Sequence, residues 1–120
     1  MFISYVRRTS AGHAEALYQL AEQLAQAAAE RWSRMFGSAH PDTLWAMGNL
    51  AESRRAQGDL DRAADLLEDV MEGRLRVLGG SHPDTLWAVT TLADVRRAQG
   101  DTASAEELTA RATAMRRNGY

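Results

Sequence analysis

Apolar side chains recur every three or four residues along most of this chain, which is the spacing that gives an α-helix one buried face. The clearest stretch is residues 60–78, with apolar positions at Leu60, Ala63, Ala64, Leu67, Val70, Met71, Leu75 and Leu78. The same rhythm predicts helices at about 41–57, 83–99 and 102–117. An Ala-rich stretch, residues 13–36, has on one side Leu17, Leu20, Leu24, Ala28 and Met35. The pattern therefore predicts an all-α protein of about five helices.

Residues with known positional preferences mark the ends of these helices. Pro41 and Pro83 suit a first helical position, where no hydrogen bond is lost, and Gly58 and Gly100 are typical helix stops. The first residues differ, because apolar and β-branched residues alternate over positions 2–6. We expect a strand or an irregular apolar segment there.

The chain also contains an internal repeat of 42 residues. The heptapeptide His-Pro-Asp-Thr-Leu-Trp-Ala begins at His40 and again at His82, and residues 40–59 and 82–101 share 15 of 20 positions. Weaker matches extend one period earlier, such as Leu24 with Leu66. We divide the chain into an N-terminal segment (1–12), a degenerate first repeat that keeps only its second helix (13–39), a full repeat (40–81) and a final repeat (82–120).

The last predicted helix is more polar than its copy one repeat earlier. Thr109, Thr113 and Arg117 stand where residues 67, 71 and 75 are apolar. Either this helix is a solvated cap, or its next neighbour is missing.

Composition narrows the functional classes. The 120 residues allow one small domain, and the absence of Cys excludes disulfides, thiolate metal sites and cysteine nucleophiles. The net charge of −2 makes nucleic acid and anionic membrane surfaces poor partners. The first residues do not have the charge order of a secretory signal, so we expect a cytoplasmic protein. All 14 basic residues are Arg, which hints at a GC-rich bacterial genome.

The repeated unit resembles the tetratricopeptide repeat of kinesin-light-chain type. Its residues 40–79 carry the motifs HPDTL, NLA and QGD, followed by an Ala-rich helix that ends in Leu-Gly. The resemblance covers about residues 13–117. It implies an α-solenoid of antiparallel helix pairs, in which the first helix of each pair lines a concave groove for peptides or partner segments. Where the family often has paired Asn, this chain has Gly48-Asn49 and Thr90-Thr91, and Arg54 and Arg96 replace a core aromatic.

A second and weaker resemblance concerns the first residues alone. Phe2-Ile3-Ser4-Tyr5, followed by Arg7-Arg8, is similar to the first strand of a TIR domain. The similarity covers fewer than 30 residues and leaves no room for the remaining strands.

A helical projection separates two faces on the helix that follows Pro41. Its packed face holds Leu44, Met47, Leu50, Ala51 and Arg54, and its other face holds Trp45, Gly48, Asn49, Glu52, Arg55 and Ala56. The second copy repeats the latter as Trp87, Thr90, Thr91, Asp94, Arg97 and Ala98. From these faces we predict a partner-binding set: Trp45, Asn49, Glu52, Arg55, Trp87, Thr91, Asp94 and Arg97. The alternative is that each Trp packs against the first helix of the neighbouring repeat or covers the exposed end of the stack.

The remaining polar residues favour structural roles. His40 and His82 are expected to cap helices rather than bind metal, since His13 lies in a different unit. The same His-Pro-Asp tripeptide marks J-domain co-chaperones. There it occurs once, whereas in this chain it occurs twice, at the repeat spacing. We expect Arg54 and Arg96 to pack their aliphatic stems and to pair with neighbouring carboxylates or carbonyls. Nearby acids should neutralise Arg55 and Arg97.

No catalytic motif or phosphate loop is found, so we expect no enzymatic activity, no cofactor and no metal. The favoured hypothesis is a protein-interaction module. The apolar solenoid ends indicate either self-association or origin as a piece of a longer repeat array. The rival hypothesis is a regulatory or sensor segment of a larger bacterial signalling ATPase or TIR-domain protein.

Overall fold

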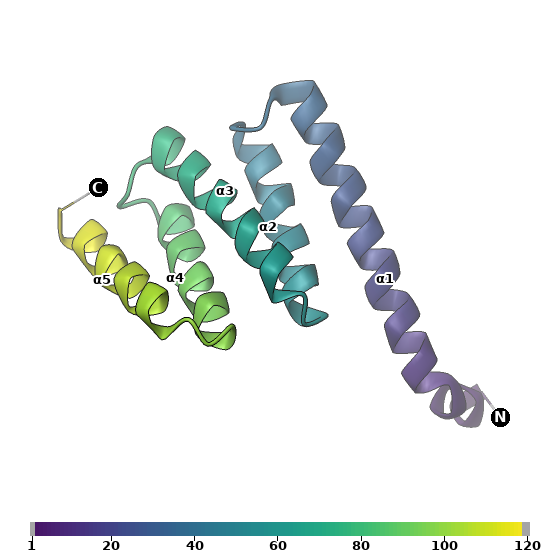
Figure 1. Ribbon diagram of the computed structural model, residues 1–120. Coiled ribbons are helices and arrows are strands. Elements are labelled where there is room, and N and C mark those ends of the chain that lie inside the picture. Colours follow the sequence, from purple (N-terminus) through teal and green to yellow (C-terminus); the bar gives the residue numbers. More distant parts are fainter. Residues whose placement is uncertain (1, 119–120) are drawn as a thin grey trace.

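The computed structural model describes residues 2–118, with side chains placed from Ala16 onward except at Tyr18, and it consists of five α-helices (Figure 1). The helices are α1 (Phe2–Phe36), α2 (Pro41–Ala56), α3 (Leu60–Leu78), α4 (Pro83–Ala98) and α5 (Thr102–Asn118). No strand occurs within residues 2–118. The predicted all-α class is confirmed, and α2 to α5 begin and end within one residue of their predicted bounds.

The expectation for the first residues was wrong, because α1 already begins at Phe2. A strand needs a neighbouring strand for its backbone hydrogen bonds, and residues 2–118 offer none. An established helix instead gains one hydrogen bond for each residue it adds. Gly12 alone does not interrupt it, and no Pro lies within it. The strand implied by the TIR resemblance is therefore not formed.

Each helix packs against the next one in the chain, which arranges the five in a single row (Figure 1). The row measures 59 × 36 × 21 Å, with α1 at one end and α5 at the other. This is the α-solenoid that was predicted. No helix in the described part of the chain is both long and apolar enough to cross a membrane.

The turns are made by the residues predicted to make them. Pro41 and Pro83 begin α2 and α4, and the chain leaves these helices through Gly58 and Gly100, whose φ angles are 82° and 87°. Side chains rarely tolerate this left-handed conformation, whereas glycine adopts it freely. The two long repeats therefore turn in the same way.

The core lies within α2 to α5. Its fully buried side chains come mainly from the middle of the row and include Leu67, Val70, Val89, Leu92 and Val95. Among the described side chains of α1, the buried hydrophobic residue is Ala29. The end of the solenoid formed by α1 is therefore much less well covered than the middle.

Candidate functional site

The two tryptophans of the predicted partner-binding set have different surroundings. Trp45 on α2 is 63 % exposed, whereas Trp87 on α4 is 37 % exposed. The ring of Trp87 lies on Gly48, where its Cζ3 would be 3.4 Å from an added β-carbon. The guanidinium carbon of Arg74 lies 5.3 Å from the centroid of the same ring, a cation–π contact. Packing therefore holds Trp87, whereas Trp45 projects into solvent.

The repeat explains the difference. α2 lies one period before α4 and supplies the surface that Trp87 contacts. The 42-residue spacing would place the corresponding helix before α2 at about residues 1–14, but residues 2–14 continue directly into α1. Trp45 and Asn49 are thus exposed, whereas of their copies Thr91 is buried and Trp87 is partly covered.

Two predicted surface positions are buried instead. Gly48 was expected on the outer face of α2, but it forms part of the contact with Trp87. Thr91 is only 6 % exposed and cannot reach a partner in this arrangement. A projection of one helix shows which residues share a side but not which neighbouring helix covers that side.

The exposed arginines pair within their own helices. Arg55 Nη1 lies 3.6 Å from Glu52 Oε1, and Arg97 Nη1 lies 3.2 Å from Asp94 Oδ1. The prediction that these charges are neutralised locally is confirmed. Such exposed pairs contribute little to stability and can be broken to bind another group.

Arg54 and Arg96 join each first helix to the helix before it. Arg54 is buried, with Nη1 2.8 Å from Glu22 Oε1 of α1 and Nη2 donating to Gln26 Oε1 at 3.3 Å. One repeat later, Arg96 donates to Glu68 of α3, the position equivalent to Gln26. The predicted packing of these arginines against neighbouring carboxylates is confirmed. They are structural residues that position α2 and α4.

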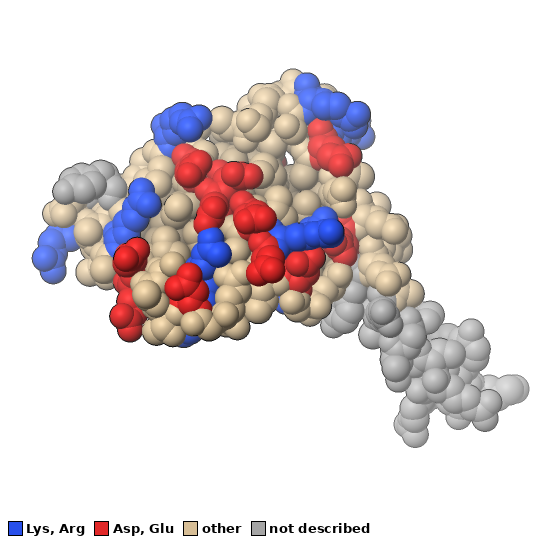
Figure 2. All heavy atoms as spheres, in the orientation of Figure 1, with Lys and Arg blue, Asp and Glu red and all other residues tan. Residues whose placement is uncertain are grey.

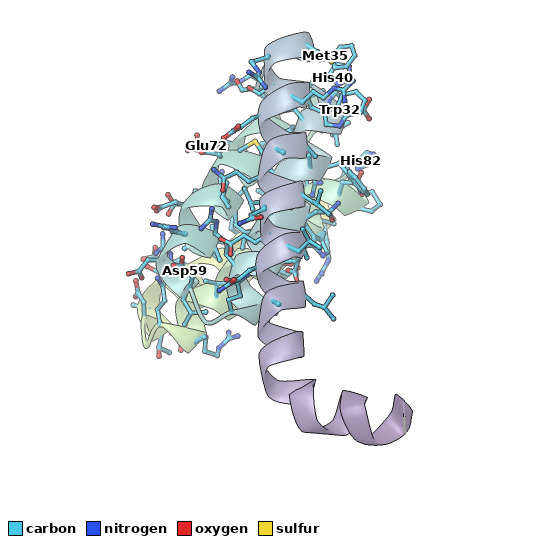
Figure 3. The ribbon with its side chains drawn as sticks, turned by 90° about the vertical axis from the view of Figure 1, so that its right-hand side faces the viewer. Trp32, Met35, His40, Asp59, Glu72 and His82 are labelled. Carbon is cyan, nitrogen blue, oxygen red and sulfur yellow. The ribbon has the colours of Figure 1, made fainter. Side chains whose placement is uncertain are left out.

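The histidines cap the helices, as predicted. The Nδ1 atoms of His40 and His82 accept the backbone N–H of Asp42 at 3.1 Å and of Asp84 at 3.0 Å. Figure 3 shows both histidines on the same side of the molecule as Trp32. Among the described side chains, no three His, Asp or Glu residues converge as metal ligands would.

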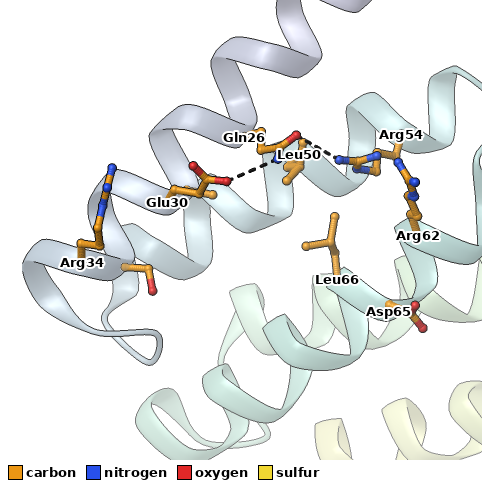
Figure 4. A pocket seen from close by; sticks show the side chains of 10 residues that line it. Gln26, Glu30, Arg34, Leu50, Arg54, Arg62, Asp65 and Leu66 are labelled. Carbon is orange, nitrogen blue, oxygen red and sulfur yellow. Dashed lines mark hydrogen bonds between the residues drawn. The ribbon is translucent and has the colours of Figure 1, made fainter.

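A groove of about 600 Å³ lies between α1 and α3, over α2, and was not predicted (Figure 4). Ala29, Leu50 and Leu66 supply apolar lining, and polar side chains such as Arg34 and Asp65 also line it. A smaller cavity of about 370 Å³ occupies the equivalent place one repeat later. Its lining includes Met71 at the position of Ala29. Comparing lining positions 42 residues apart would have indicated this groove.

Acidic side chains gather over α3 on the face shown in Figure 2. Partial burial raises the pKa of Asp69, and the nearby carboxylates of Glu72, Glu68 and Asp65 raise it further. The cluster is an unfavourable concentration of like charge rather than a ligand site.

Comparison with known proteins relates this geometry to other chains. The model of the family described as "Tetratricopeptide repeat" matches residues 13–76 and 49–118. The crystal structure of nearly identical TPR-like repeats, from a Podosopora anserina protein designated a kinesin light chain, superimposes with a TM-score of 0.78 at 26 % identity. A point variant of that protein gives 0.79, also at 26 % identity. In both cases the match covers 96 % of this chain and 53 % of the other, so this chain spans about half the length of these structures. No curated protein matches the chain.

Proposed function

Because the chain belongs to the tetratricopeptide repeat family, we propose that it is a non-enzymatic module that binds a peptide or protein segment along α2 and α4. Repeats of this family generally serve protein–protein interaction. The partner would be held by side chains, with no cofactor.

One observation carries the proposal: Trp45 is 63 % exposed beside other side chains that can bind a polypeptide. Asn49 and Glu52 follow it at helical spacing and are exposed, so all three lie along one side of α2. Tryptophan is enriched among residues that dominate binding energy, because its ring buries a large area. The Asn49 amide can both donate to and accept from a peptide backbone.

Charged residues on both helices would orient the partner. Arg55 and Arg97 can each exchange an exposed intrahelical pair for a two-point contact with a carboxylate of the partner. Glu52 and Asp94 would then be free to accept from its N–H groups or cations. Trp87, which keeps about a third of its surface exposed, would extend the apolar contact on α4. Thr91 has no part in the proposed surface because it is buried.

The direct test is selection from a displayed library of random peptides, followed by titration of each selected peptide against variants. Trp45→Ala should weaken binding at least about tenfold, as expected for an anchor residue, without changing the melting temperature. Arg55→Ala should selectively weaken peptides that contain Asp or Glu. Arg111→Ala, on the exposed surface of α5, is the matched control. Selected peptides that bind Trp45→Ala and wild type equally would refute this surface.

The rival function, a regulatory or sensor segment of a larger bacterial signalling ATPase or TIR-domain protein, uses the same fold differently. The repeats would then contact an enzymatic domain encoded next to them. Sequencing the adjacent coding region distinguishes the two, because the rival requires a nucleotide-binding or TIR domain in the same reading frame.

A further inference from the structure

The outer side of α1 carries a row of exposed side chains that we call the α1 seam: Leu17, Leu20, Leu24, Ala27, Arg31 and Met35. Leu17, Leu20 and Leu24 are 58, 52 and 64 % exposed. Successive members of the seam are three or four residues apart over almost three heptads. This is the spacing by which two helices pack in a coiled coil, so the shape that fits the seam is another helix.

α1 packs on the body through its other side. Glu22 and Gln26 contact Arg54 of α2, and Ala29 is buried in the same region. At 100° per residue, the middle of the seam lies well away from these three positions. The seam leucines therefore lie on the side of α1 that faces away from α2, and more than half of each is exposed, although leucine is among the residues most often buried.

The opposite end of the solenoid differs in chemistry. On α5, Thr109, Thr113 and Arg117 are exposed where α3 has Leu67, Met71 and Leu75. A head-to-tail contact would place the apolar seam on this polar surface. A contact in which two copies use the same patch avoids that mismatch and closes with two-fold symmetry.

The distribution of large and small side chains along the seam favours an antiparallel over a parallel pairing of two α1 helices. The first half of the seam carries leucines, while its second half borders a hollow of about 480 Å³ lined by Ala27, Ala28, Arg31, Trp32 and Met35. In an antiparallel pair centred on Leu24, Leu20 of each copy faces Ala28 of the other. A parallel pair would place leucine on leucine and alanine on alanine, which leaves a costly void.

Size and charge are those of a weak pair. Centred on Leu24, two antiparallel copies of α1 overlap only over residues 12–36, a length of about 37 Å, and a contact strip about 10 Å wide would bury about 750 Å² over both copies. That is below the area of a stable interface, so we expect a weak dimer that forms at high concentration. α1 contains four Arg and three Glu, so two copies repel each other little.

We propose that two copies of the chain associate through their α1 seams, antiparallel, about a two-fold axis near Leu24. This gives a specific surface to the expected self-association. It uses none of the residues proposed to bind a peptide, so either proposal can fail without the other.

The absence of native Cys allows a direct test with single-cysteine variants of the full chain. Mild oxidation should convert Leu24→Cys into a covalent dimer. Gln19→Cys, exposed on the same helix but off the seam, should remain monomeric in denaturing electrophoresis. A mixture of Leu20→Cys and Ala28→Cys chains should give the mixed dimer predominantly, because only the antiparallel pair opposes these positions.

Light scattering provides a second measurement. Wild type should show twice 13.2 kDa at about 100 µM, and Leu24→Glu should raise the dimer dissociation constant about 100-fold or more, because the pair would bury two like charges. Circular dichroism checks that Leu24→Glu stays folded; should it unfold, the cross-links decide. Equal cross-linking of Gln19→Cys and Leu24→Cys, a monomeric wild type, or failure of the mixed pair would each overturn the proposal.

Discussion

The indole of Trp87 rests on Gly48, so that α4 reaches α2 through a position without a side chain. Gly73 of α3 is approached more closely: Cδ2 of the buried Leu44 would lie 2.7 Å from a β-carbon at Gly73, against 3.4 Å for Trp87 Cζ3 at Gly48. Both glycines lie inside helices and neither has a positive φ. Close packing rather than backbone conformation therefore distinguishes them.

The same substitution should have opposite effects at these two glycines. Gly48→Ala meets only ordinary contacts and should stabilise the protein by about 0.5–1 kcal/mol, the difference in helix propensity. Gly73→Ala should destabilise it by about 1 kcal/mol, because overpacking against Leu44 exceeds the same gain. Denaturant unfolding of both variants beside wild type measures the difference. A stabilised Gly73→Ala would show that Leu44 moves aside at little cost.

Removing Trp87 should destabilise the protein more than removing Trp45, because Trp87 is the less exposed of the two. Trp87→Ala should cost about 1–2 kcal/mol, less than a core Trp because the ring is partly exposed. Trp45→Ala should change the free energy of unfolding by less than about 0.5 kcal/mol. Thermal unfolding of the two variants checks this. A large loss of stability in Trp45→Ala would mean that its ring packs on the protein and is not available to a partner.

The sequence sufficed for the features that depend on local chemistry. Pro41, Gly58 and their copies determine where the helices begin and end, and the motif spacing identifies the repeat. The surroundings of Thr91 could not be read in this way, because its burial depends on the neighbouring α2. Trp45 and Trp87 lie in identical heptapeptides, yet among the residues that the structure describes only Trp87 has a preceding helix of the same type to pack on.

Residues 2–14 are a second case in which the local sequence was not enough to predict the structure. Alternation of apolar residues favoured a strand, but helix continuation into α1 prevailed because no partner strand exists in residues 2–118. The groove beside Ala29 was likewise invisible to a reading of one helix at a time, since three helices form it.

The acidic side chains of α3 lead us to expect that replacing Asp69 by a neutral residue stabilises the protein at neutral pH but not at low pH. The pKa of Asp69 is raised in the folded chain, so its ionised form costs stability at neutral pH. That cost disappears as the pH falls through the raised pKa, because the folded state then takes up the proton. Asp69→Asn should therefore raise the melting temperature at pH 7, and the gain should vanish near pH 3. Glu106→Gln on α5 is the control; a gain independent of pH would exclude charge as its cause.

Ala29 and Met71 occupy the same position in successive repeats. Replacing each by the other's residue type tests whether the groove between α1 and α3 is a packing defect. Met71→Ala should cost about 2–4 kcal/mol, because it removes a buried side chain and leaves a cavity. Ala29→Met should instead stabilise the protein by about 1 kcal/mol, since the adjacent groove of about 600 Å³ can accept the added atoms. Denaturant unfolding of both variants gives the two values. If Ala29→Met destabilised the protein, α1 would have to sit closer to α3 than the groove implies, and the groove would not be open in solution.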